Sequence, residues 1–355
     1  MKARHLLLVL FLLPMLALWG CEGDAGPAGP SGADGTDGTN GVDGVDGVDG
    51  VDGNTTCLDC HNTDVQNSIS LQFDRSQHDA GTIAVDYAGG RASCAKCHSG
   101  NGYVEWATTG TVAADITTPT PWECGTCHDI HTTFEQADYA LRMNDPVVWI
   151  GDEGYGDTSF DFGDNSNVCA WCHQARRAEP NVTNPGETFT ITSTHYGPHH
   201  GAMANVVAGV TFAEIPGSMA YPTGNFGHLD AGINCVDCHM GDYSDGAGGH
   251  TWWPNLDNCT TCHSSATSFD IGGVQTDTQE MLDTLRDLLL AQGVIEWVEE
   301  DEAYEPVVGT YTMAQGQAFF NWIGLTEDRS LGVHNPPYVE ALLNNSIEAI
   351  TVPTQ

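Results

Sequence analysis

Positively charged residues are almost missing from this chain of 355 residues. There are 10 Lys and Arg against 48 Asp and Glu, which gives a net charge of −38, and the lysines are Lys2 and Lys96. So few cations cannot form a basic surface for phosphate, which excludes nucleic-acid binding as a main role and argues against docking on anionic lipid. The negative charge favours solubility and cationic partners, metal ions or minerals.

Long apolar runs are missing too, because no stretch reaches 18 residues, and we do not expect the mature chain to span a membrane. A basic start followed by 13 apolar residues, 6–18, predicts a secretory signal peptide over residues 1–20. The tetrapeptide that ends at Cys21 resembles a bacterial lipobox, except that Trp19 replaces a small residue. We predict an exported outer-membrane lipoprotein, anchored through Cys21 at the periplasmic or cell-surface face. Ordinary cleavage that leaves a free thiol is the alternative.

Glycine recurs at every third position from Gly23 to Gly53. This spacing suits a collagen triple helix, because only Gly fits at its crowded axis. Proline occurs only at Pro27 and Pro30 here, and the many Asp have no Lys or Arg to pair with, so a flexible acidic tether is an equal alternative. Either form makes residues 21–53 a stalk that holds the following domain away from its anchor.

Twelve of the 13 cysteines occur in six copies of one motif, C-x-x-C-H. This motif is the attachment signature of c-type haem, because its two thiols can bond to the vinyl groups of one porphyrin while the His lies below the iron as proximal ligand. Zinc sites and redox-active dithiols, the alternatives, do not require a His after every second Cys. We therefore predict six covalently bound haem c groups. The attachment residues are Cys57, Cys60, Cys94, Cys97, Cys124, Cys127, Cys169, Cys172, Cys235, Cys238, Cys259 and Cys262, and the proximal ligands are His61, His98, His128, His173, His239 and His263.

The six motifs share residues 57–263, a stretch of 207 residues or about 35 for each haem. That is too little protein to bury six macrocycles in an ordinary core, so the haems must themselves form the core. We predict a mostly α and irregular fold for a hexahaem cytochrome domain over residues 54–268, with short helices and loops around stacked haems. Close haems are what electron transfer needs.

Eight histidines remain after the six proximal ones and His5 in the signal peptide. Ligation of each iron by two histidines explains this surplus. A His close to one motif cannot easily reach the far face of the same haem, so we expect it to ligate a neighbouring haem and tie the haems into a continuous chain. The predicted distal ligands are His78, His131, His199, His228, His250 and His334, with His195 or His200 as alternatives to His199.

The stretch beyond residue 268 changes to a helical pattern and contains no further C-x-x-C-H motif. Apolar residues at helical spacing predict one helix from Thr276 or Asp277, a second over residues 313–325 and a third from Pro336. Residues 269–355 should form a helical cap that packs on the haem domain and supplies His334 as a ligand.

Most of the predicted distal histidines lie in recognisable short motifs. These are Ser76-Gln77-His78, Cys127-His128-Asp129-Ile130-His131, His195-Tyr196-Gly197-Pro198-His199-His200-Gly201, Cys238-His239-Met240, Gly249-His250-Thr251 and Gly332-Val333-His334-Asn335-Pro336. Together they resemble the large multihaem c-type cytochromes of metal-reducing bacteria, over roughly residues 54–350. The resemblance implies low-potential, bis-His haems stacked as a wire in the periplasm or at the outer surface, which pass electrons outward.

The predicted function is electron transfer rather than enzymatic catalysis, in anaerobic or extracellular respiration that includes the reduction of metals or minerals. The alternative is a multihaem reductase of a small oxyanion, such as nitrite or a sulfur compound, which needs one haem with an open axial position. The C-x-x-C-K motif typical of nitrite reductases is absent, since Lys96 lies inside a motif and not after it. The expected partners are redox proteins and extracellular electron acceptors, and contact with the membrane is through the lipid anchor only. A trimer through the stalk and a filament both stay open.

Overall fold

The computed structural model describes residues 30–33, 35, 61–79, 81, 84–134, 136–151, 158–180, 187–224 and 227–351. The chain divides into two compact units, Met1–Gly50 and Val51–Gln355. The predicted signal peptide, Cys21, most of the stalk, and Cys57 with Cys60 of the first motif lie outside the described residues, so what the sequence indicates for them stays a prediction.

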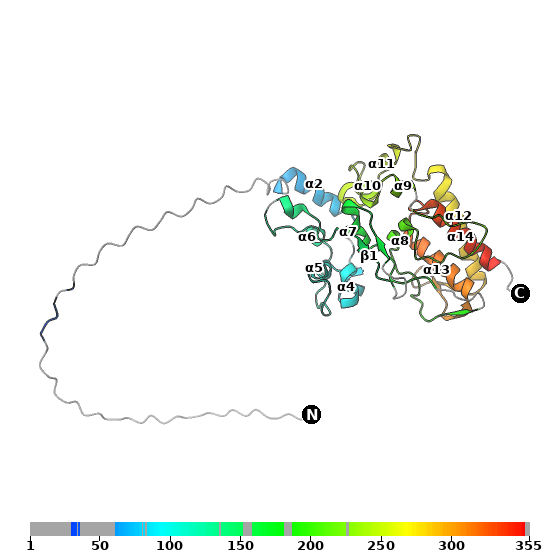
Figure 1. Cartoon of the computed structure of the whole chain (residues 1–355), viewed down its shortest axis with the longest axis horizontal. Helices are drawn as coiled ribbons and strands as arrows, with labels where there is room; N and C mark the ends of the chain where they lie inside the picture. Colours follow the sequence, from blue (N-terminus) through cyan, green and yellow to red (C-terminus); the bar gives the residue numbers. More distant parts are fainter. Residues whose placement is uncertain are drawn as a thin grey trace, which may run out of the picture. The chain divides into compact units, whose positions relative to one another are not determined.

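Short helices separated by irregular chain make up the motif-bearing part of the second unit (Figure 1). Five of them, α4, α6, α7, α10 and α11, carry cysteines of the C-x-x-C-H motifs. The α-helices are α2 (Thr63–Phe73), α4 (Ala92–His98), α5 (Gly100–Thr109), α6 (Cys124–Cys127), α7 (Asn167–Ala170), α8 (Met203–Ala208), α9 (Gly227–Asp230), α10 (Cys235–His239) and α11 (Leu256–Thr260). Single turns of π- or 3₁₀-helix are η1 (Val85–Gly89), η2 (Gln136–Tyr139), η3 (Asp164–Ser166), η4 (Gly249–Thr251) and η5 (Ile271–Gly273).

Local hydrogen bonds start two of the motif helices at their first cysteine. Capping boxes pair Glu123 with Thr126 at the start of α6 and Asn234 with Asp237 at the start of α10. In the second box, the Asp237 carboxylate accepts from the Asn234 N–H at 2.8 Å. Such boxes satisfy N–H groups that have no partner within the helix. At these two motifs, local hydrogen bonds therefore stabilise the turn that presents two thiols and a His.

The strands are few and short, and each pairs with one antiparallel neighbour. They are β1 (Val147–Val148) with β2 (Ser159–Phe160), β3 (Thr188–Ile191) with β6 (Gly309–Thr312), and β4 (Ile295–Val298) with β5 (Ala303–Pro306). In the second pair, Thr188 lies opposite Thr312 and Ile191 opposite Gly309. This pairing joins the motif-bearing part of the chain to its C-terminal part.

Three longer helices, α12 (Val274–Ala291), α13 (Met313–Asp328) and α14 (Pro336–Thr351), form the C-terminal cap (Figure 1). They share one apolar core that contains Leu285, Phe319 and Leu342, all fully buried. Val206 and Phe212, from the motif-bearing part, belong to the same core. Burial of each such side chain stabilises the fold by about 1.5–3 kcal/mol. The cap thus packs on the motif-bearing part through one continuous core, and the mostly α and irregular fold class is confirmed.

The predicted starts of the last two helices are correct, but that of the first is wrong by two or three residues. Helix α12 begins at Val274 and not at Thr276 or Asp277. The reason is Asp270, whose carboxylate accepts from the N–H groups of Gln275 and Thr276 at 2.8 and 3.2 Å. A carboxylate four residues upstream therefore satisfies the first turn. Within the described residues, no helix combines the length and apolar character that crossing a membrane requires.

Candidate functional site

Six pairs of facing histidines are the main feature of the motif-bearing part. In each pair one ring belongs to a C-x-x-C-H motif and the other is a histidine predicted as a distal ligand. The separations of the ring centroids are 6.1 Å for His61–His131, 5.9 Å for His98–His199, 6.4 Å for His128–His250, 6.1 Å for His173–His78, 6.3 Å for His239–His334 and 6.4 Å for His263–His228. The structure thus brings together all twelve histidines that were predicted to hold iron.

These separations fit two imidazoles that share one metal ion between them. An imidazole nitrogen bonds a metal at about 2 Å, and the centroid of a five-membered ring with bonds of about 1.35 Å lies about 1.1 Å from each nitrogen. The centroids of two rings on opposite sides of one ion are therefore about 6.2 Å apart. The six observed centroid separations agree with this value, since they lie between 5.9 and 6.4 Å. The chain's own residues fit an iron that a porphyrin holds in its plane and two histidines hold on its faces.

A zinc framework fits the same residues poorly. Structural zinc takes four protein ligands in a tetrahedron. In the part of the chain that the structure describes, no three His, Cys, Asp or Glu side chains converge as a metal site. The histidines instead meet in twos, which is the number of axial ligands that a haem iron needs.

The pairs connect segments that are distant in the sequence. His78 lies 16 residues before Cys94, but it faces His173. His228 is seven residues before Cys235 and faces His263. His250 faces His128, and His131, which follows His128 by three residues, faces His61. As expected from the sequence, each of these four histidines faces a motif other than the one nearest to it in the chain.

The cluster at residues 195–200 contributes His199 to a pair and leaves its two alternatives outside. Burial, with a contribution from Arg176, lowers the pKa of His199 to about 3, and its ring faces that of His98. His195 is exposed. The His200 side chain is 79% exposed, and its Nδ1 lies 2.5 Å from a carboxylate oxygen of Glu327. The geometry therefore favours His199 over both neighbours as the partner of His98.

Three of the paired histidines are oriented by a hydrogen bond at Nδ1. The acceptors are the carbonyl of Tyr139 for His128, at 2.7 Å, and the carbonyl of Trp252 for His239, at 2.8 Å. With Nδ1–H donating, the Nε2 lone pair is free to bind a metal.

The third of these histidines, His334, has a carboxylate as its partner. Its Nδ1 lies 2.6 Å from an oxygen of Asp328, whose side chain is only 1% exposed. Burial by itself disfavours a charge on His334, but the Asp328 carboxylate outweighs it and raises the pKa of His334. Asp328 is therefore a buried carboxylate that is hydrogen-bonded to one of the paired histidines.

Cysteines of different motifs lie against one another. Cys97 and Cys172 are within hydrogen-bonding contact, and each thiol also approaches a carbonyl of the other motif, at 3.8 and 4.0 Å. Cys169 is in similar contact with Cys235. Ser166 strengthens this second junction by accepting from the Val236 N–H at 3.1 Å. The fourth motif therefore lies directly beside both the second and the fifth motif.

Trp252 touches three of the histidine pairs, and no role was predicted for it from the sequence. Its ring centroid is 4.7 Å from that of His78 and 5.7 Å from that of His250, and its carbonyl accepts from His239. Its backbone φ of 54° lies in the left-handed region, which is uncommon for a bulky residue. A tryptophan two residues after a predicted distal ligand was the available signal. Asp328 was also missed, because only the tertiary structure brings it to His334.

No family model matches the chain, and no curated protein does so either. Among solved structures, the chain is similar to the outer cell wall cytochrome OcwA, with a TM-score of 0.49 and 19% sequence identity. The similarity covers 79% of this chain and 49% of that one, so the chain spans about half the length of that protein.

Proposed function

We propose that the chain is a hexahaem c-type cytochrome, which transfers electrons along a series of bis-His haems in anaerobic or extracellular respiration. The observation that supports this function is that each of the six motif histidines faces a second histidine at the spacing of one shared metal ion. Bound haem would supply an iron that gains and loses one electron. The thioether-forming cysteines would fix each porphyrin in place.

The protein's own contribution to this function is the two histidines of each pair, which would ligate the iron. They would supply the two ligands that the porphyrin leaves to the protein, so water and substrates would have no position at which to bind the iron. At several of them burial disfavours the protonated form and so favours the form that can ligate, as at His173, where it lowers the pKa to about 4. Because both ligands suit both oxidation states, an electron can come and go while no bond is made or broken.

The contacts between motifs support transfer from site to site. Cys97 meets Cys172, Cys169 meets Cys235, and Trp252 bridges three pairs, so neighbouring porphyrins would lie close together. We propose that the protein is exported, anchored through Cys21 and held away from the membrane by its stalk. Redox proteins would be its donors, and metal complexes or minerals its acceptors.

The test of this function is the coordination state of the purified, haem-loaded protein. Six haems per chain by mass, an entirely low-spin spectrum, and no spectral change when CO or nitrite is added to the reduced protein are expected. Rapid reoxidation of the reduced protein by a soluble Fe(III) chelate should accompany these results. A high-spin fraction that binds CO, together with catalytic turnover of nitrite or sulfite, would instead support the oxyanion reductase.

A further inference from the structure

Four of the eight Lys and Arg in the part of the chain that the structure describes lie around one histidine pair, that of His98 and His199. Arg176 is beside this pair, since its N–H donates to the carbonyl of Pro198, the residue before His199, at 2.8 Å. The charges of Arg91 and Arg176 act on His98, and those of Arg176 and Arg177 act on His199. In a chain with a net charge of −38, this is a local concentration of positive charge.

Lys96 adds a further positive charge at the same place. It belongs to the motif of His98, and its Nζ lies 3.9 Å from the ring centroid of Trp106 and 4.5 Å from that of Trp171. Two aromatic faces at this distance attract a cation and hold it still. The ammonium group is thereby kept beside the junction of Cys97 and Cys172.

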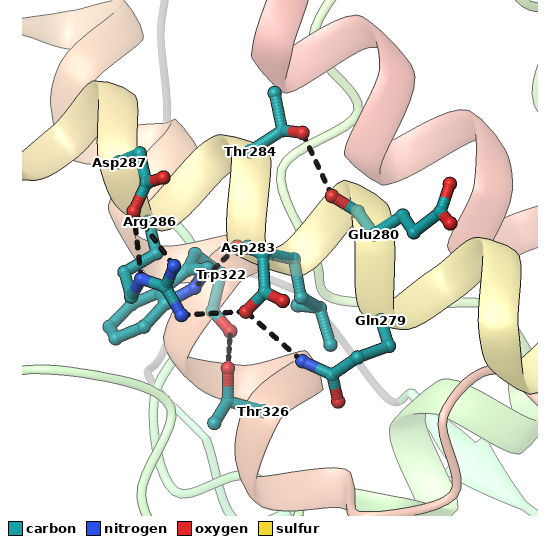
Figure 2. A network of polar contacts seen from close by, with 9 residues as sticks. Gln279, Glu280, Asp283, Thr284, Arg286, Asp287, Trp322 and Thr326 are labelled. Atoms are coloured by element: carbon teal, nitrogen blue, oxygen red, sulfur yellow. Dashed lines mark hydrogen bonds and ion pairs between the residues drawn. The ribbon is translucent and has the colours of Figure 1, made fainter.

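Two of the other cations in the described chain are neutralised more directly. Arg142 pairs with Asp129 at 2.6 Å. Arg286 lies between Asp283 and Asp287 on α12, at 2.6 and 2.8 Å (Figure 2). Carboxylates at these distances cancel most of the field that an arginine exerts on a distant group.

The opposite charge lies at the pair of His239 and His334. The buried Asp328 carboxylate accepts from His334 Nδ1, as described above, and its other oxygen is hydrogen-bonded to the Ser330 hydroxyl. A carboxylate that accepts from a ligand imidazole makes that imidazole a stronger electron donor to its metal. The same negative charge opposes the arrival of an electron at the iron.

We propose that these charges give the array a direction, with the highest reduction potential of the six at the His98–His199 site and the lowest at the His239–His334 site. The proposal rests on the electron-transfer function proposed above. A positive charge near an iron stabilises the added electron, and a negative charge destabilises it. An electron that moves between these sites oxidises one iron and reduces the other, and it needs no proton or further reactant. Electrons therefore collect at the His98–His199 site, beside the exposed side chains of Arg176 and Arg177.

The test is an equilibrium redox titration of the full haem-loaded chain that resolves six one-electron steps. The double variant Arg176→Gln/Arg177→Gln should shift the most positive step downward. Asp328→Asn keeps an oxygen acceptor at His334 and should shift the most negative step upward. We expect the ratio of reduced to oxidised iron at a fixed potential to change about tenfold in each case, which is about 59 mV for one electron. Arg286→Gln, which removes one positive charge where the double variant removes two, is the control and should move no step.

Each outcome decides the proposal. Movement of an intermediate step by the arginine variant, or equal movement by Arg286→Gln, would overturn it. Arg176 and Arg177 are exposed, and their replacement removes the contact of Arg177 with the Tyr196 ring, 5.8 Å from its centroid. The result at the highest step decides the proposal even if Asp328→Asn fails to fold. Loss of the electron-transfer function itself has a different signature, which is CO binding by the unaltered protein.

Discussion

Replacing His199 by Gly should open one iron site and leave the other five closed. His199 is the residue that faces His98, at 5.9 Å between ring centroids. Glycine is the suitable replacement, because the backbone φ at this position is 79°, which alanine would adopt only with strain. The variant therefore removes a ligand without a backbone penalty.

The expected magnitude follows from the number of motifs and from the position of His200. With one of six sites open, the reduced variant should bind one CO per chain, and about one sixth of the haem absorbance should change. His200 is not placed to replace the lost ligand, since its Nδ1 is 2.5 Å from Glu327 and its ring centroid is 5.3 Å from that of His199. Substitution by His200 would require it to leave this carboxylate and move by a distance comparable to the ring separation.

The assay is a titration of the dithionite-reduced protein with CO, followed by difference absorbance. His195→Ala and His200→Ala are the matched controls, because they remove a histidine from the same cluster, and neither should take up CO. CO uptake by His200→Ala in place of His199→Gly would refute the assignment of the ligand. Absence of uptake in all three variants would refute the pairing of this cluster with His98.

Three further predictions concern the bridge between sites, the cap and the start of α12. Trp252→Leu should alter the low-spin EPR signals of two sites, because its ring no longer fixes the planes of two distal imidazoles, whereas Trp253→Leu, at a side chain that is 48% exposed, should not. Leu285→Ala should lower the free energy of unfolding by about 2–5 kcal/mol, and Leu290→Ala, at a 41% exposed position, by less than about 0.5 kcal/mol in a denaturant titration. Hydrogen bonds from the start of α12 lower the pKa of Asp270 below 3.8, so its stabilising effect is present above that unfolded value and is lost as the pH falls through the lower folded value. Asp270→Ala should therefore weaken the fall of the melting temperature below about pH 4; an unchanged acid profile would contradict this role.

From the sequence, the set of histidines that form pairs was predicted better than the two members of each pair. Counting the histidines left over from the motifs gave eight candidates for six distal positions, because the chemistry of a six-coordinate iron sets the number of ligands. The pairing depends on tertiary contacts, such as that of His78 with His173, and only a rule about proximity could be stated in advance. The choice among the histidines of the 195–200 cluster needed the position of Glu327, which is more than 100 residues away.

The fold was predictable where its cause is local. Periodic apolar residues indicated the three helices of the cap, and Pro336 correctly marked the start of the last one. The start of α12 was missed because Asp270 caps it from outside the periodic segment. Strand pairs such as β3 with β6 were not predicted, since four residues give too weak an alternation and the partner lies over 100 residues further on.

The crossing pattern of the histidine pairs has a consequence for maturation of the chain during export. Each iron would act as a crosslink that closes a loop, and the loop from His239 to His334 is 95 residues long. With export N-terminus first, as proposed above, five of the pairs could be completed by residue 263, while the fifth motif would wait for His334, 71 residues further on. A chain without His334 would lose this last closure, and the buried Asp328 carboxylate would lose the imidazole from which it accepts a hydrogen bond.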